Sequence, residues 1–482
     1  MKKLFLIGAT ALMVSNSTFA GGILTNTNQN AAFLRNPARG AVIAIDGVYS
    51  NPAGIAFMPQ GFHLSVSWQA AWQKRLMDVN NSLFGMNADG KGASRTFEGV
   101  AKAPVIPSFQ AAYVINDKWS VSAQFAVGGG GGKCEFAEGL PMFEELIGSA
   151  AAGINAQVNP DSKQFSYALN QNLTGEQYFY GLQIGGTYKI AENLSVFGGV
   201  RTVLASCNYT GAINNFKVNG IDAKNFAPTF AQAYQLAVDA AKQAAAAGNA
   251  QAASQYQAAA TKAGMVAQLT KEDLTLDCSQ SGIGFTPIIG IDWNLGKLNL
   301  AAKYEFRTKI NLENDSKNSS NVDVLMAQYA NGAKNRSDIP AILTLGAMYQ
   351  ITDNVRAMGG FHYYWDKDAK GTPIKKGDNT WEANLGIEWD VNDKVLLSLG
   401  GQRTQYGFDD TDMQDTNFNI SSSAICVGGA YKFTEKIKLN VGYMHSFYGN
   451  HKFERTTESG LKTACDYTRK NDVVGASLDI TF

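Results

Sequence analysis

The chain has 482 residues, and its 41 Lys plus Arg balance its 41 Asp plus Glu, so the basic surplus expected of a nucleic-acid-binding protein is absent. Its 49 glycines, 26 phenylalanines and 19 tyrosines against only 11 prolines are typical of a β-rich protein. Five cysteines (Cys134, Cys207, Cys278, Cys426, Cys465) lack any CxxC spacing, which favours neither a zinc site nor a dense disulfide framework. We expect no metal, no cofactor and no nucleic-acid partner.

The N-terminal residues have the three parts of a secretory signal peptide. Two lysines follow Met1, then an apolar run of about 11 residues, then the small-residue end Thr18-Phe19-Ala20. An uncleaved membrane anchor is the alternative, but a spanning helix needs roughly 20 apolar residues. We predict a signal peptide over residues 1–20 with cleavage after Ala20. No cysteine follows that site, so lipid attachment is not expected.

Residues 21–60 come before the first strand and are apolar for an exposed tail. Two apolar groups, at 31–34 and 41–45, are separated by glycine and polar residues. A free, water-exposed tail would be hydrophilic. We therefore predict that 21–60 is an N-terminal hatch, or plug, buried inside the strands that follow.

Apolar and polar residues alternate repeatedly along positions 61–482. In the last segment Val474, Leu478 and Phe482 share one face, and Ser477 and Asp479 share the other, as in a strand with one apolar face. The pattern predicts fourteen strands, at 61–74, 105–115, 119–130, 177–190, 194–207, 282–294, 297–309, 340–351, 354–366, 379–391, 394–405, 422–433, 437–448 and 471–482.

Very short turns alternate with longer loops between these strands. Six short turns are predicted, at 116–118, 191–193, 295–297, 352–354, 392–394 and 434–436. An even strand number with short turns at one end is typical of outer-membrane barrels. The predicted fold is all-β, a 14-stranded antiparallel transmembrane β-barrel at 61–482 with the hatch in its lumen and helical extracellular loops, in the outer membrane of a Gram-negative bacterium. A soluble β-sandwich, the alternative, does not explain tight turns on one side only.

Two loops contain helical candidates. One lies at 140–156, and the other, at 231–268, is rich in Ala, Gln and Lys with interruptions at Gly248 and Gly264. Such helices either form a landing groove for an apolar ligand or cover the barrel mouth.

Five consecutive glycines end the third predicted strand: Gly128, Gly129, Gly130, Gly131 and Gly132. Glycines permit backbone conformations that break a strand ladder. The run predicts either a kink that opens the barrel wall sideways or a flexible exit from strand to loop.

Two cysteines lie at the ends of the longest loop, where adjacent strands emerge. Cys207 and Cys278 are therefore a candidate disulfide. Cys426 with Cys465 is a weaker second candidate.

The motif Asn51, Pro52, Ala53 and Gly54 ends the Gly- and Ala-rich hatch directly before the first strand. With the fourteen strands, the helical third outer loop and the terminal Phe482, it resembles the outer-membrane long-chain fatty acid and hydrophobic compound transporters of the FadL/TodX type. That family usually has Asp-Ala-Ser a few residues ahead of Asn-Pro-Ala, where this chain has Asp46-Gly47-Val48.

The resemblance implies a hatch that blocks the lumen, a hydrophobic pocket beside it, and lateral release of ligand at a kinked third strand. In the family, charged groups on the inner wall hold the Asn-Pro-Ala turn. By strand parity Arg201, Glu305 and Arg307 point inward and are the candidates for this role. Alternatively, they line a wet lumen.

The implied function is passive outer-membrane transport of hydrophobic small molecules, long-chain fatty acids or similar lipophilic compounds, without catalysis. A general diffusion porin is an alternative, against which the apolar hatch stands. An outer-membrane enzyme is a third, but the four histidines (His63, His362, His445, His451) lie in no catalytic motif. The expected partners are the lipophilic ligand, outer-membrane lipid, and the barrel-assembly machinery through Phe482.

Overall fold

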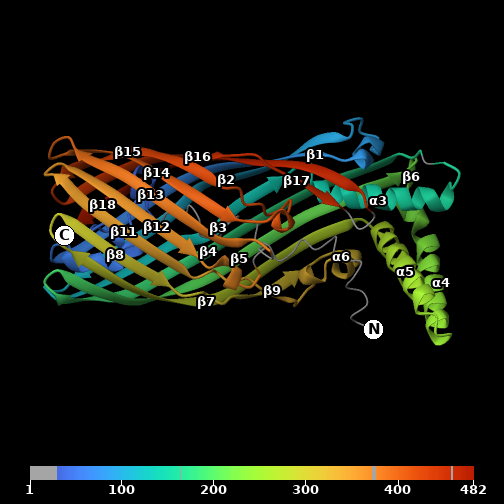
Figure 1. Cartoon of the computed structure of the whole chain (residues 1–482), viewed down its shortest axis with the longest axis horizontal. Helices are drawn as coiled ribbons and strands as arrows, with labels where there is room; N and C mark the ends of the chain where they lie inside the picture. Colours follow the sequence, from blue (N-terminus) through green and yellow to red (C-terminus); the bar gives the residue numbers. More distant parts are fainter. Residues whose placement is uncertain (1–29, 163, 372–375, 457–459) are drawn as a thin grey trace.

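Fourteen long strands close into an antiparallel barrel in the computed structural model (Figure 1). The structure describes residues 30–162, 164–371, 376–456 and 460–482. The predicted signal peptide, its cleavage site and positions 21–29 of the predicted hatch lie outside these ranges. β1 pairs with both β2 and β18, which closes the ring.

The barrel strands follow one another around the ring in chain order. They are β1 (Gly61–Asn80), β2 (Ser94–Val114), β3 (Trp119–Phe136), β4 (Tyr167–Ala191), β5 (Leu194–Val218), β7 (Leu274–Asn294), β8 (Leu298–Glu305), β11 (Ile342–Thr352), β12 (Val355–Tyr364), β13 (Asp378–Asp390), β14 (Val395–Gly407), β15 (Ser422–Thr434), β16 (Ile437–Tyr448) and β18 (Lys462–Thr481). Four short strands only extend these ladders: β6 (Ile221–Asp222), β9 (Asn311–Ser316), β10 (Lys334–Arg336) and β17 (His451–Thr456).

Period-two alternation gives the barrel an apolar outer face and a polar inner face. In β1, Val66 and Trp68 are exposed on the outside, whereas Ser65 and Ser67 are buried inside. An outward apolar face is stable only against lipid, and the inner polar groups hydrogen-bond within the lumen. The six predicted short turns all lie at the end that carries the C-terminus, which we assign to the periplasm (Figure 1).

Several strands are longer than predicted. β4 and β5 each have 25 residues, because both continue past the apolar band toward the outside. Outward positions of β4 change from Leu182 and Ile184 through Tyr178 and Tyr180 to polar residues such as Asn172. Water wets this outer part, so it lacks the apolar alternation on which the prediction depended.

Helices gather at the outer end of the barrel, at the right of Figure 1. They are α3 (Pro141–Val158), α4 (Ala227–Ala246), α5 (Ala250–Lys271) and α6 (Ser320–Leu325), with short 3-10 turns η3 (Ser82–Met86), η4 (Ala223–Phe226), η5 (Ala327–Tyr329), η6 (Asp366–Asp368) and η7 (Asp410–Asp412). Both predicted helical loops are confirmed. Gly248, at φ +72°, separates α4 from α5, but Gly264 lies inside α5 and does not interrupt it.

Two roles were predicted for these helices, a landing groove for an apolar ligand or a cover of the barrel mouth. α3 has the second role. Leu140 and, within α3, Phe143, Ile147 and Ile154 are buried in a large apolar cluster with residues of the strands' inner faces. Within the described residues, no helix combines the length and apolar character needed to cross a membrane.

Candidate functional site

Residues 30–60, here called the hatch segment, lie inside the barrel. The segment contains α1 (Ala31–Arg35), α2 (Gly47–Ser50) and the 3-10 turn η2 (Pro52–Phe57). Asn30 donates hydrogen bonds to Ser65 Oγ and Gln110 Oε1 of the wall, both at 2.9 Å. A Cβ added to Gly442 would lie 2.7 Å from Leu34 Cβ, so this wall position permits close approach only as glycine. The predicted placement inside the lumen is confirmed for these described residues.

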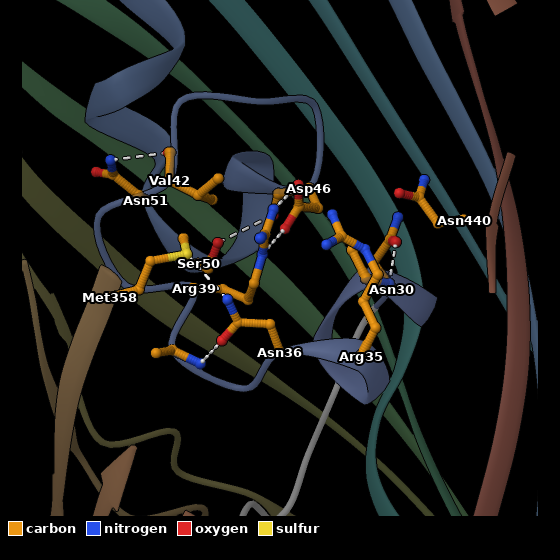
Figure 2. A network of polar contacts seen from close by, with 12 residues as sticks. Asn30, Arg35, Asn36, Arg39, Val42, Asp46, Ser50, Asn51, Met358 and Asn440 are labelled. Carbon is orange, nitrogen blue, oxygen red and sulfur yellow. Dashed lines mark hydrogen bonds and ion pairs between the residues drawn. The ribbon is translucent and has the colours of Figure 1, made fainter. Parts of the chain in front are cut away.

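An ionic network joins the hatch segment to β13. Glu388 Oε1 lies 2.6 Å from Arg35 Nη1 and 2.9 Å from Arg39 Nη1, and both arginines belong to the hatch segment. Arg356 of β12 contacts the other oxygen of Glu388 at 2.7 Å. Asp46 accepts two hydrogen bonds from Arg39, at 2.7 and 2.9 Å (Figure 2). One wall carboxylate thus receives three guanidinium groups in a buried site.

This network was missed by the sequence reasoning, although a signal was present. Arg35, Arg39 and Asp46 are charged residues in an otherwise apolar segment, and a buried charge requires a partner. Glu388 occupies an alternating position of a strand that was correctly predicted. Only the closed barrel, however, brings β13 beside a segment some 350 residues earlier in the chain.

The predicted Asn-Pro-Ala-Gly motif is seated on the wall by backbone and side-chain hydrogen bonds. Asn51 Nδ2 donates to Asp292 Oδ2 of β7 at 2.5 Å. It also donates to Val42 O at 3.1 Å (Figure 2). Asn51 Oδ1 accepts from Gly54 N at 3.3 Å, so the side chain also caps η2. Asn299 donates to the same Asp292 oxygen at 2.9 Å. Asp292, which was not predicted, is therefore the wall carboxylate that contacts the motif.

Two further wall side chains hold the carbonyl groups of the motif. Thr187 Oγ1 donates to Pro52 O at 2.9 Å, and Ser195 Oγ donates to Ala53 O at 2.7 Å. Ala53 packs against Phe197 and Ile288. The turn therefore contacts three neighbouring strands of the wall, β4, β5 and β7.

Arg201 and Glu305, two of the three predicted lumen residues, form a buried ion pair at 2.5 Å. Lys303, which was not predicted, joins them: its Nζ lies 2.7 Å from Glu305 Oε1 and donates to Tyr49 O of the hatch segment at 2.6 Å. The Tyr49 ring lies 4.1 Å from Lys303 Nζ and 5.2 Å from the guanidinium carbon of Arg201. The cluster contacts the residue two positions before Asn51 rather than the motif itself.

The predicted inclusion of Arg307 in this cluster is wrong. β8 ends at Glu305, so the alternation of inward and outward side chains does not extend to Arg307. Arg307 instead donates to the carbonyl oxygen of Asp368, and its Nε lies 3.8 Å from Asp338, with the side chain about one-third exposed.

We expect Asn51→Ala to loosen the seat of the hatch segment. The change removes three hydrogen bonds and leaves Asp292, whose Oδ1 already has no partner, dependent on Asn299 alone. The free energy that holds the hatch segment against the wall should become about 1–3 kcal/mol less favourable. Hydrogen exchange over 42–57 should accelerate, whereas Asn116→Ala in a periplasmic turn should leave it unchanged. Equal protection in both variants would contradict the assigned role of Asn51.

The glycine run lies where the ladder between β2 and β3 is interrupted. Lys102 pairs with Lys133, and the next aligned pair is Ser108 with Ala126, so 103–107 and 127–132 have no partners in that register. The register of β3 with β4 shifts within the same run. Gly130 and Gly132 have φ values of +102° and +66°, which favour glycine. The backbone is therefore distorted where the sequence predicted a kink or a flexible exit.

Two prolines that the sequence reasoning did not use lie in the stretch of β2 that loses its pairing with β3. Pro104 and Pro107 of β2 fall within the interrupted stretch and have no N–H group to donate to a ladder. The pairing of β2 with β1 also shifts between Gln69 and Ala71. Proline on one strand and glycine on its neighbour together account for the break.

A small cavity connects the glycine run with the ion cluster. Its lining includes Gly128, Phe179, Arg201 and Glu305. It offers about 10 Å³ to the centre of a water molecule, which is room for about one water. In this conformation the cavity is too small for a lipophilic ligand, so passage there requires the hatch segment or the wall to move.

Two buried glutamates hold α3 across the barrel mouth. Glu144 Oε1 lies 2.6 Å from Arg95 Nη1 and accepts a hydrogen bond from Asn87, and Glu145 Oε1 lies 2.9 Å from Arg455 Nη2. Burial raises the pKa of both carboxyls above the usual value, although these partners act in the opposite direction. The protonated form of each therefore persists to higher pH in the folded protein.

The predicted disulfide between Cys207 and Cys278 is wrong, because both thiols are free. The register sets Cys207 opposite Gln280 and Cys278 opposite Tyr209, so the cysteines are diagonal rather than facing neighbours. Diagonal pairs are about 7–8 Å apart, beyond the reach of a disulfide without backbone movement. Cys426 and Cys465 are also free. Among the described residues, no group of three or more His, Cys, Asp or Glu side chains is placed to hold a metal ion.

No protein-family model and no curated protein matches the chain. Solved structures do. A FadL homologue of Pseudomonas aeruginosa matches with a TM-score of 0.65 at 14% identity, over 96% of this chain and 100% of that chain. The toluene transporter TodX of Pseudomonas putida matches at 0.53 and 14%, over 91% and 94%, and the toluene transporter TbuX of Ralstonia pickettii at 0.50 and 11%, over 95% and 100%. These likenesses show the fold: the chain is a β-barrel with the fold of the FadL/TodX-type structures, as the strand pattern and the family resemblance predicted.

Proposed function

We propose that this protein carries hydrophobic small molecules passively across the outer membrane and releases them sideways between β2 and β3. The observation that carries the proposal is the interrupted ladder between these strands, beside a lumen occupied by the hatch segment. A molecule that is soluble in the membrane can leave through the wall, whereas an ion or a sugar needs an aqueous path along the axis.

The similar structures support this proposal at the level of fold. Their names describe a FadL homologue and transporters of toluene. Long-chain fatty acids and other lipophilic compounds are the ligands we propose here. The polar contacts of the hatch segment support a role as a plug, because they seat it against nine strands of the wall (β1, β2, β4, β5, β7, β8, β13, β14 and β18).

A general diffusion porin is the second candidate, and the buried charges speak against it. Glu388, Arg35 and Arg39 are buried, and such a cluster belongs to a packed interface rather than to the wall of a wet pore. We propose no catalytic activity.

Reconstituted vesicles can separate these functions. We expect the intact protein to transfer a fluorescent long-chain lipophilic probe across the bilayer while conducting no steady ion current. Deletion of residues 21–60 should produce an open, ion-conducting barrel. Steady current from the intact protein would favour the porin. Absence of probe transfer by the intact protein, together with absence of current after the deletion, would contradict both transport functions.

A further inference from the structure

A row of lysines crosses the outer surface of four neighbouring strands. Lys470 of β18 pairs directly with Lys74 of β1, and Lys102 of β2 pairs directly with Lys133 of β3. Trp72 pairs with Lys102, which places the two lysine pairs at nearly the same height. All four side chains are exposed. With strands about 4.8 Å apart, the row is about 15 Å wide.

The row lies at the outer boundary of the apolar band. Along β1 the outward residues are Val66, Trp68 and Trp72 up to this level, and Lys74 follows. On β2 and β3 the outward residues on the periplasmic side include Phe109 and Phe125, both exposed to lipid. Aromatic residues followed by cations are typical of the level at which lipid headgroups begin.

Like charges that face each other directly on neighbouring strands destabilise a sheet. Nearby carboxylates compensate only part of the row, because Glu98 pairs with Lys74 at 2.7 Å and Glu135 pairs with Lys133 at 2.5 Å. Asp472 is engaged by Tyr443 and His445. Glu176 of β4 is the direct cross-strand neighbour of Lys133. Within the described residues, Lys102 and Lys470 form no ion pair, so each lysine pair keeps one ammonium group without a salt bridge.

The second pair also borders the interrupted ladder. Lys102 with Lys133 is the last aligned pair on the outer side of the break, before the unpaired stretches 103–107 and 127–132. Repulsion between the two ammonium groups works against closure of the wall there, and an anion between them would relieve it.

We propose that this row binds the phosphate groups of a phosphorylated lipid of the outer leaflet, with Lys102 and Lys470 as the principal contacts. Lipid phosphate is the anion present at this depth, and lysine binds it as a point charge without requiring a shaped pocket. The bound lipid lies across β18, β1, β2 and β3 and covers the outer edge of the break.

The test uses the full-length protein in detergent and compares binding of a diphosphorylated glucosamine-disaccharide lipid with that of its dephosphorylated counterpart, by native mass spectrometry. Each lysine near a charged lipid surface contributes a factor of about five to affinity. We expect the Lys102→Gln/Lys470→Gln variant to bind the phosphorylated lipid about 25-fold more weakly, and the double arginine variant to keep the affinity. Lys118→Gln/Lys394→Gln, in two periplasmic turns, is the matched control.

Three results would overturn the proposal. They are equal binding of the two lipids by the unaltered protein, undiminished binding by the glutamine variant, and equal loss in the periplasmic control. Inorganic pyrophosphate as competitor identifies the source of the anion: displacement of the lipid by pyrophosphate at matched concentration would mean a site for free phosphate instead. All four lysines are exposed, so the variants should fold, and heat-modifiable gel mobility verifies this. The outcome does not depend on whether the protein transports ligand.

Discussion

In the Glu388→Gln variant we expect steady ion conductance from a barrel that is otherwise closed. Glu388 is the only carboxylate in the described residues that contacts both Arg35 and Arg39, and it also neutralises Arg356. Removing its charge leaves the buried Arg35 without its carboxylate partner, whereas Arg39 keeps Asp46 and Arg356 keeps Asp390. Breaking a buried pair in this way costs about 3–5 kcal/mol. That cost falls on the seated form of the hatch segment, since an unseated segment can hydrate its arginines.

Planar-bilayer recordings measure this directly, together with entry of a large hydrophilic antibiotic into cells. Glu192→Gln is the matched control, because Glu192 lies exposed in a periplasmic turn. Both variants should show normal heat-modifiable mobility, because the barrel ladder does not involve these side chains. A closed Glu388→Gln barrel would show that the hatch segment is held by its apolar and backbone contacts alone.

The Gly130→Val variant should take up a hydrophobic ligand at least about fivefold more slowly. Its φ of +102° is strained for any β-branched residue, and an added Cβ would overlap the carbonyl oxygen of Gln177 on β4. Strain of about 1–3 kcal/mol shifts β3 toward an ordinary extended conformation by about 5–150-fold. An extended β3 can realign with β2 and narrow the break.

Gly198→Val on β5 is the control for this change. It is also a strand glycine, but an added Cβ there meets no atom within 4 Å. Ligand transfer into vesicles is compared for both variants at equal amounts of folded barrel. Unchanged transfer by Gly130→Val would remove the route between β2 and β3, and equal slowing by Gly198→Val would point to a general effect of strand glycines.

The barrel could be predicted because its evidence is local. Each strand is recognised by alternation over some ten residues, and each periplasmic turn by a short group of turn-forming residues. The number of strands and the positions of the turns could therefore be predicted without tertiary information. The outer halves of β4 and β5 were not predicted, because they face water rather than lipid and so lack the apolar alternation. Phe482 lies exposed, and its ring is tilted against that of Phe62 with centroids 5.5 Å apart. Its recognition by the assembly machinery stays a prediction.

The site was predicted only in part, because its contacts join distant segments. Arg201 and Glu305 were found from parity, since both lie in regular ladder positions. Arg307 was misplaced because β8 ends before it, and inward and outward positions alternate only as far as the strand continues. Lys303, Asp292 and Glu388 have the same inward parity but became recognisable only once the hatch segment was placed against them.

By itself, the sequence determined the class of fold, the number of strands and the hatch motif, since these depend on periodicity and turn residues within short windows. The tertiary structure alone decided which wall charges meet the hatch segment, that Cys207 and Cys278 are diagonal, and that the unpaired stretch of β2 with its two prolines runs beside the glycine run of β3. Closure of a barrel sets neighbours by register across hundreds of residues, and a shift of one residue reverses every inward and outward assignment.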